Sequence, residues 1–136
     1  MEYRIERGEL NETAIAHLRP ALDGHPYYGM TELAMQLQQG RAALYHIHSN
    51  PCHVGTFALA VNALANGREE IEITAGGAAT DGPDMTQICV KFARQVAIDA
   101  GIDIVRNNTR RQGVGRLLER YGMQLDEYIY RMEIQQ

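Results

Sequence analysis

The feature that most constrains the fold is a long stretch in which apolar side chains recur at helical spacing. Between Met85 and Ala100 the apolar positions follow the i, i+3, i+4, i+7 pattern of an amphipathic helix. Asp84 is a suitable N-cap, and Gly101 is suited to end the helix. The nearly continuous apolar run at residues 102–105 predicts a short strand buried on both faces. So tight a helix–strand connection predicts a β-α-β unit with a parallel pair of strands.

The middle of the chain predicts a β-meander. Residues 42–48 and 53–64 alternate in the manner of strands, and residues 70–74 alternate charged with β-branched side chains. Asn66 and Gly67 form the strongest short hairpin signal that a sequence offers.

The remaining segments complete a single mixed sheet with helices on its faces. Asn11 is suited to cap a helix over residues 12–19 that Pro20 should stop, and Thr31 is suited to cap a second helix. The further predicted elements are a first strand at residues 3–7, a helix at 31–39, a helix from 110 or 112 to 121, and a final strand at 125–134. The predicted order is β α α β β β α β α β, an α/β (α+β) protein with one domain over residues 1–136.

The composition indicates the class of protein, its cell compartment and the partners it can bind. A chain of 136 residues suits one domain, and 45% hydrophobic with 22% charged residues is a globular balance. The longest uncharged apolar-rich run, residues 54–65, is shorter than the roughly 20 residues of a membrane span. Two cysteines make no disulfide framework, so we expect a cytoplasmic protein. The net charge of −4 makes nucleic acid an unlikely partner.

The basic residues are nearly all arginine and are unevenly distributed along the sequence. Twelve of the thirteen are arginine, and five of these lie between Arg106 and Arg120. Such a cluster suits a phosphate, a carboxylate substrate or the acidic surface of a partner protein, because guanidinium groups bind these anions in a bidentate manner. The alternative interpretation is a solvated helix face, and both interpretations stay open.

Two further groups of polar residues carry candidate chemistry. Glu70 and Glu72 lie on a predicted strand. Either they belong to a solvated face of that strand, or one of them acts as a general base. His46 and His48 share a strand face and His53 lies across a turn, but no cysteine or carboxylate completes a set of zinc ligands in the sequence. We expect the histidines to be structural and the site to hold no metal.

This order of elements resembles the GNAT fold, that of the Gcn5-related N-acetyltransferases. The sharpest local match begins at Val90: a long helix ends at Ala100 and Gly101, a strand follows, and a last helix closes with Tyr121, Gly122 and Met123. Thr109, Arg110 and Arg111 also resemble a branch of small GNAT-like proteins encoded in phage genomes. Such a protein would lie in the host cytoplasm or in the virion.

The resemblance implies acetyl-CoA as cofactor and an amine as acceptor. The pantetheine arm would lie between two diverging parallel strands, residues 71–74 and 102–105, and the diphosphate on the loop before the central helix. The implied cofactor-binding residues are Ile73, Thr74, Gly76, Gly77, Gly82, Arg110 and Arg111. A helix N-terminus suits a phosphate because its backbone N–H groups are free, and glycines allow close approach.

The resemblance also implies catalytic roles. Glu72 would accept the ammonium proton, Tyr121 or Tyr128 would protonate the thiolate, and Tyr27 with Tyr28 would border the acceptor pocket or simply pack in their loop.

The chain departs from the family pattern at three points: the loop has no leading Gln or Arg, it carries Asp81 and Asp84, and Leu118 stands where the family places its tyrosine. These departures favour an alternative, a catalytically inactive GNAT-fold interaction or assembly protein such as a phage genome could encode.

Overall fold

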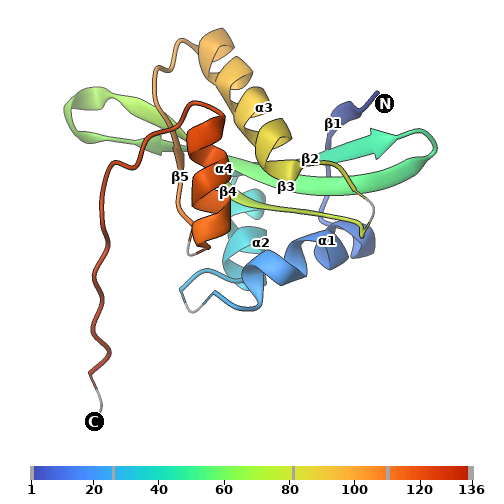
Figure 1. Cartoon of the computed structure of the whole chain (residues 1–136), viewed down its shortest axis with the longest axis horizontal. Coiled ribbons are helices and arrows are strands. Elements are labelled where there is room, and N and C mark those ends of the chain that lie inside the picture. The colour runs from blue at the N-terminus through green and yellow to red at the C-terminus, as the bar shows by residue number, and fades with distance from the viewer. Residues whose placement is uncertain (1, 26, 81, 110, 135–136) are drawn as a thin grey trace.

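The computed structural model describes residues 2–25, 27–80, 82–109 and 111–134. Within these residues the chain forms five strands in one sheet, four α-helices and one short 3-10 helix (Figure 1). The elements in chain order are β1 (Arg4–Gly8), α1 (Glu12–Leu22), α2 (Met30–Gln38), β2 (Ala42–Ser49), β3 (Cys52–Ala63), η1 (Ala65–Gly67), β4 (Glu69–Ala78), α3 (Met85–Ala100), β5 (Val105–Asn107) and α4 (Gln112–Arg120).

The sheet is mixed, as the sequence predicts. Its strands follow one another in chain order, the first three pairings are antiparallel, and β4 pairs with β5 in parallel. Helix α3 is the crossover between these two parallel strands, so the predicted β-α-β unit is confirmed. The predicted hairpin is also confirmed, because Asn66 and Gly67 both adopt positive φ between β3 and β4.

Alternate residues of the strands supply two cores, one on each face of the sheet. Phe57 and Ile71 belong to the core under α3 and α4, whereas Ala58 and Ala75 belong to the core that packs against α1 and α2. In Figure 1, α1 and α2 lie below the sheet and α3 rises on its other side. The sheet is therefore covered on both faces, which is the layered arrangement expected from the order of elements.

The predicted cap at Thr31 is wrong, because α2 already begins at Met30 and no side chain caps it. Local signals explain the bounds of α1 and α3, with one exception. The side chains of Asn11 and Asp84 accept hydrogen bonds from the backbone N–H groups of Ala14 and Gln87, and Gly101 ends α3 with φ of 71°. The prediction that Pro20 stops the first helix is wrong, because α1 continues to Leu22. Leu18 and Leu22, one turn apart, are both buried. Burying this pair offsets the hydrogen bond that a proline cannot donate.

Two predicted strands need correction at the β5 edge. The strand expected at residues 102–105 lies at Val105–Asn107, because the N–H of Ile102 still caps α3 by donating to the carbonyl of Ala97 (2.8 Å). The strand expected at residues 125–134 is wrong: this segment joins no ladder of the described structure. It extends away from the body of the molecule on the left of α4 in the view of Figure 1. Its alternating pattern defines two faces, but a strand also needs a partner.

The fourth strand is longer than predicted, and this changes the glycine-rich loop. Gly76 and Gly77 are strand residues of β4 rather than members of a loop before α3. A side chain at Gly77 would come within 1.8 Å of the carbonyl oxygen of His17 in α1, so this glycine lets α1 lie against the sheet.

We predict that Gly77→Ala destabilises the fold by at least about 2–3 kcal/mol, because backbone atoms cannot move aside as a side chain can. The measurement is the free energy of unfolding in urea. Gly115→Ala in α4 is the matched control, since nothing lies within 4 Å of its added methyl group. The control should gain about 0.5–1 kcal/mol from helix propensity. Equal effects of the two substitutions would contradict the packing role of Gly77.

Candidate functional site

The candidate site lies where β4 and β5 part. Their parallel pairing extends only from Ile71 to Ile73, so the following residues of β4 have no β5 partner on that edge. The pairing of β3 with β4 also skips one residue here, and the skipped residue is Thr74. The Thr74 hydroxyl donates to the carbonyl of Ala58 at 3.2 Å. Bulges of this kind re-aim side chains and backbone groups beside functional sites.

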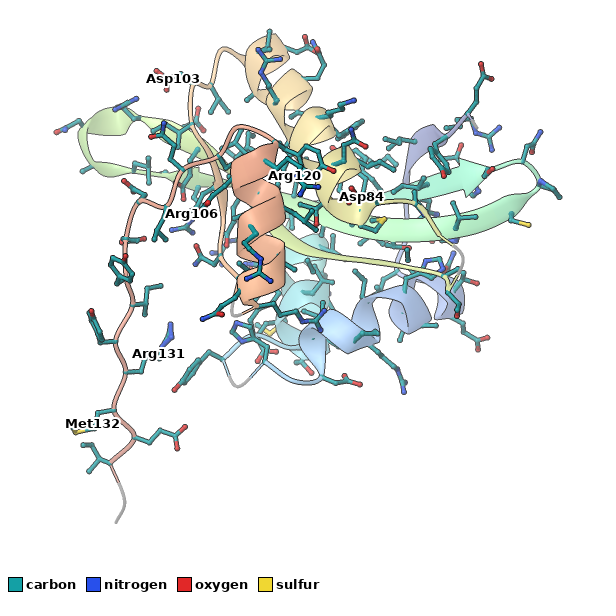
Figure 2. The ribbon with its side chains drawn as sticks, viewed as in Figure 1. Asp84, Asp103, Arg106, Arg120, Arg131 and Met132 are labelled. Carbon is teal, nitrogen blue, oxygen red and sulfur yellow. The ribbon has the colours of Figure 1, made fainter. Side chains whose placement is uncertain are left out.

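Two glutamates and one arginine form a charged network next to this bulge. The Arg106 guanidinium on β5 lies 3.1 Å from Glu70 through Nε and 3.1 Å from Glu72 through Nη2. The side-chain amide of Asn62 donates to both carboxylates, at 3.2 Å to Glu70 and 2.7 Å to Glu72. Figure 2 shows Arg106 beside β5, next to α4. The network carries two negative charges against one positive charge, so its excess charge suits a cation.

Burial distinguishes the two glutamates. Glu70 is only 4% exposed, whereas the side chain of Glu72 is 22% exposed. A buried carboxylate needs a countercharge, and Arg106 supplies it. Glu72 is therefore the more exposed of the two carboxylates, and its role as a proton acceptor stays a proposal.

The loop between α1 and α2 brings Tyr28 to the same place. The ring nitrogen Nδ1 of His25 accepts the N–H groups of Tyr27 (3.1 Å) and Tyr28 (2.9 Å), which fixes the loop. The Tyr28 hydroxyl donates to Gln36 at 2.6 Å. Burial raises the pKa of Tyr28; a hydrogen bond with Thr74 lowers it, and the negative charge of Glu72 raises it further. Tyr28 is thus a neutral hydrogen-bonding group beside Glu72 and Thr74.

The N-terminus of α3 carries its own anion. The Asp84 carboxylate caps the helix and also accepts a hydrogen bond from the Tyr121 hydroxyl at 2.6 Å. This hydrogen bond raises the pKa of Tyr121, so its phenol stays protonated. Figure 2 shows Asp84 at the start of α3. The N-terminus of a helix carries a partial positive charge, and the Asp84 carboxylate already supplies a negative charge to it.

The residues predicted to bind a cofactor have structural contacts of their own. A side chain at Gly82 would come within 2.6 Å of Ala78, so packing already accounts for this glycine, whereas one at Gly76 would meet Cys89 only at 3.4 Å. Arg111 donates to the carbonyl of Pro20 in α1 at 2.9 Å. Arg110 lies outside the described residues. Leu118, at the position of the family's tyrosine, is buried in the core under α3 and α4.

The arginine cluster divides into separate contacts. Arg106 belongs to the glutamate network and Arg111 to α1, so they do not form one anion-binding patch with each other. The sequence interpretation missed the partnership of Arg106 with the glutamates, and it missed Asn62 altogether. The signal for Asn62 was present, because the hairpin register places it opposite Glu70.

A groove of about 1270 Å³ opens next to the network. Glu70, Arg106 and residues 104–109 line one side, and residues 123–129 with Arg131 and Glu133 line the other. Tyr128 is one of the lining residues and is 74% exposed. The groove therefore reaches the buried glutamate from the side of β5.

Four histidines form a second polar cluster, on the sheet near α1. The ring of His53 lies 4.8, 4.3 and 5.0 Å from those of His17, His46 and His48. The buried Thr56 hydroxyl is hydrogen-bonded to His17 Nδ1 at 2.9 Å and to His53 Nε2 at 3.0 Å. Among the described residues, no group of three or more His, Cys, Asp or Glu side chains is arranged to hold a metal ion. None of the described helices is long and apolar enough to cross a membrane.

Solved structures share this fold. A predicted acetyltransferase with acetyl-CoA from Clostridium acetobutylicum is 12% identical, with 97% of this chain and 96% of that chain covered and a TM-score of 0.72. A ribosomal-protein-alanine N-acetyltransferase from Brucella melitensis biovar Abortus 2308 is 13% identical, with 98% and 100% covered and a TM-score of 0.72. An aminoglycoside acetyltransferase from an uncultured soil metagenomic sample is 12% identical, with 98% and 95% covered and a TM-score of 0.70.

These similarities establish that the chain has the GNAT fold, as the sequence resemblance predicted. No protein-family model matches the sequence. No curated protein matches it either.

We predict that Arg106→Ala destabilises the fold by about 2–3 kcal/mol, because it leaves the buried Glu70 carboxylate without its countercharge. Arg68→Ala removes an exposed ion pair with Asp103 and should cost less than about 1 kcal/mol. Urea unfolding measures both variants, and a loss for Arg106→Ala no larger than that control would contradict the prediction.

The histidine cluster predicts a loss of stability in mild acid. Burial and the neighbouring His46, His17 and His48 lower the pKa of His53 from 6.5 to about 4, and burial lowers that of His17. Between pH 6.5 and pH 4 the unfolded chain therefore binds more protons than the folded chain. The stability that the neutral histidines provide is complete above pH 6.5 and is lost as the pH falls toward 4. We expect the neutral His53 ring to contribute about 1–2 kcal/mol to the free energy of unfolding. This is less than its full pKa shift implies, because the ring is partly solvated.

The measurement is the melting temperature between pH 7.5 and pH 4 in wild type and His53→Asn. The substitution should flatten the profile. His25→Asn, outside the cluster, should leave the slope unchanged whatever it does to overall stability. An unchanged slope in His53→Asn would show that other groups control the acid transition.

Proposed function

We propose that this chain is an N-acyltransferase that moves an acyl group, acetyl from acetyl-CoA, to the nitrogen of a cationic amine. The observation that carries the proposal is the network of Glu70, Glu72 and Arg106 beside the Thr74 bulge, where β4 and β5 part. Its excess negative charge suits an ammonium group, and the acetyltransferases that share the fold support the type of reaction.

Glu72 has the central role at the acceptor end. An amine is protonated at neutral pH and becomes a nucleophile only after it loses a proton. The Glu72 carboxylate would hold the ammonium group and accept that proton, directly or through one water molecule. Asn62 fixes the carboxylate by donating to it at 2.7 Å. Tyr28, whose pKa responds to both Thr74 and Glu72, would contact the same substrate through its hydroxyl.

The residues at the donor end fit part of the cofactor. From Thr74 to Ala78 the edge of β4 has no β5 partner, so its backbone groups suit the amide-rich pantetheine arm, with Ile73 and Thr74 nearest the thioester. A bound acyl-CoA would supply the activated acyl group.

The diphosphate does not fit the start of α3. Asp84 is already the helix cap, and the N–H groups of Ala79 and Gly82 donate to the carbonyls of Val54 and Ala79. No lysine or arginine stands between residues 75 and 84. Arg110 and Arg111 stay proposals for phosphate contacts, Gly76 and Gly77 stay proposals for backbone contacts with the pantetheine arm, and the Gly82 N–H is already bonded within its own turn.

Tyr121 is the stronger proposal for an acid. Its phenol is held by Asp84 and remains protonated, which a proton donor requires. Tyr128 lies on the exposed segment that lines the groove, where it can approach a ligand only from the side of β5.

A second candidate follows from Asp84. A carboxylate at the position where a diphosphate would bind favours a GNAT-fold protein that has lost its cofactor and serves interaction or assembly, with a protein partner along Arg106 to Arg120. A phage-encoded member in the host cytoplasm or virion would fit this role.

Binding of acetyl-CoA separates the two candidates. We expect a rise in melting temperature equivalent to a few kcal/mol at saturating acetyl-CoA, measured by thermal unfolding with calorimetry as confirmation. Asp84→Asn should strengthen binding by roughly fivefold to tenfold, because it removes charge repulsion of about 1 kcal/mol. An absence of binding to both proteins at millimolar acetyl-CoA would exclude the acyltransferase.

The acceptor role is tested by Glu72→Gln. The glutamine keeps the shape of the side chain but removes the base, so kcat for a polyamine or aminoglycoside acceptor should fall by about 10²-fold to 10⁴-fold. Acetyl-CoA binding should be unchanged. Glu69→Gln on the same strand is the control, because its side chain is exposed and outside the network. Equal activities of the two variants would contradict the role of Glu72.

A further inference from the structure

The phenol of Tyr28 is held in one position by the protein itself. Its hydroxyl donates to Oε1 of Gln36 in α2 at 2.6 Å, and its ring packs against the core under α1 and α2. At the start of the loop, His25 Nδ1 accepts the N–H groups of Tyr27 and Tyr28, and the His25 N–H donates to the carbonyl of Leu22 at 3.1 Å. Binding of a ligand therefore requires little further ordering of this side chain.

The direction of the hydrogen bond to Gln36 decides what the Tyr28 hydroxyl can offer a ligand. A phenol has one proton to donate, and its oxygen also accepts hydrogen bonds. Because the proton is directed to Gln36, the oxygen can only accept from a ligand. An ammonium group, which brings N–H donors, matches this oxygen, whereas a carboxylate or a carbonyl group does not.

The charges around the phenol have the same preference. Burial raises the pKa of Tyr28, and the negative charges of Glu72 and Glu32 raise it further, so both carboxylates act on its hydroxyl. Glu72 lies on β4 and Glu32 in the first turn of α2, so the carboxylates come from two layers of the fold. An ionised carboxylate accepts hydrogen bonds and donates none. The two carboxylates and the Tyr28 oxygen together offer acceptors and negative charge.

We propose that Tyr28 makes the acceptor end specific for an ammonium group that carries N–H donors, and that Gln36 sets this specificity by directing the phenolic proton away from the substrate. The proposal rests on the acyl-transfer function and names the residues that select its acceptor. The ammonium would donate one N–H to Glu72 and a second to Tyr28. Tyr28 contacts the substrate, whereas Gln36 is a positioning residue that acts through Tyr28.

The role of Gln36 follows from what the phenol would do without it. With no acceptor at position 36, the Tyr28 proton would turn to one of the two carboxylates that act on it, Glu72 or Glu32. A bond from Tyr28 to Glu72 would occupy an acceptor position that the ammonium needs. The substrate would therefore meet one hydrogen-bond acceptor fewer, although the charge of the site would be unchanged.

Ligands of equal charge that differ in their N–H donors test the contact with Tyr28. The probes are n-butylammonium, which has three N–H donors, and n-butyltrimethylammonium, which has none. NMR titration, with and without saturating coenzyme A, gives both dissociation constants. Wild type should prefer n-butylammonium, and Tyr28→Phe should reduce that preference by about tenfold, because it removes one acceptor without changing charge. Tyr3→Phe, at an exposed tyrosine, is the control and should keep the wild-type preference.

This titration needs no turnover, so its outcome is separate from that of the acetyl-CoA and Glu72→Gln experiments, which test acyl transfer. An equal preference in wild type and Tyr28→Phe would overturn the proposal. A wild type that binds n-butylammonium under neither condition would also overturn it.

Two substitutions of Gln36 test the direction of the phenolic proton. Gln36→Leu removes the acceptor and should weaken n-butylammonium binding by about threefold to tenfold, whereas Gln36→Glu keeps an acceptor and should bind at least as tightly as wild type. In turnover with spermidine, Gln36→Leu should raise KM more than it lowers kcat, because the lost contact holds the bound substrate. Gln38→Leu, at an exposed glutamine of the same helix, is the control. Equal weakening by both substitutions of Gln36 would show that this residue only packs, and would overturn its positioning role.

Discussion

The contacts of Arg106 with Glu70 and Glu72 hold together the part of the molecule on which the site depends. Strand β5 has three residues, so its ladder with β4 supplies few hydrogen bonds. The two ion pairs add side-chain contacts across the same pair of strands. Because Glu70 is buried, these contacts are costly to break on one side only, since a lone buried carboxylate has no countercharge. The place where β4 and β5 part is therefore fixed by charge as much as by the backbone.

The two ends of the proposed site differ in how far they suit their ligands. At the acceptor end, Glu72 is accessible and hydrogen-bonded to Asn62, and Tyr28 stands beside it. At the donor end, the unpaired edge of β4 suits a pantetheine arm, but the carboxylate of Asp84 occupies the positive end of α3. Both candidate functions trace to this contrast, because an intact acceptor end favours the enzyme and an anionic helix start favours loss of the cofactor.

Sequence reasoning succeeded where the signal was local. The bounds of α3 follow from helical periodicity between a capping aspartate and a glycine, and the β3–β4 hairpin follows from Asn66 and Gly67. It failed at Pro20, where burial of Leu22 outweighs a local stop signal. It also missed the partners of Arg106, because contact across a parallel pair depends on register and no short-range pattern encodes that register.

Residues 125–134 illustrate the same limit in a different way. Their alternation was interpreted as a strand, but strand structure exists only with a partner, and the described chain offers this segment none.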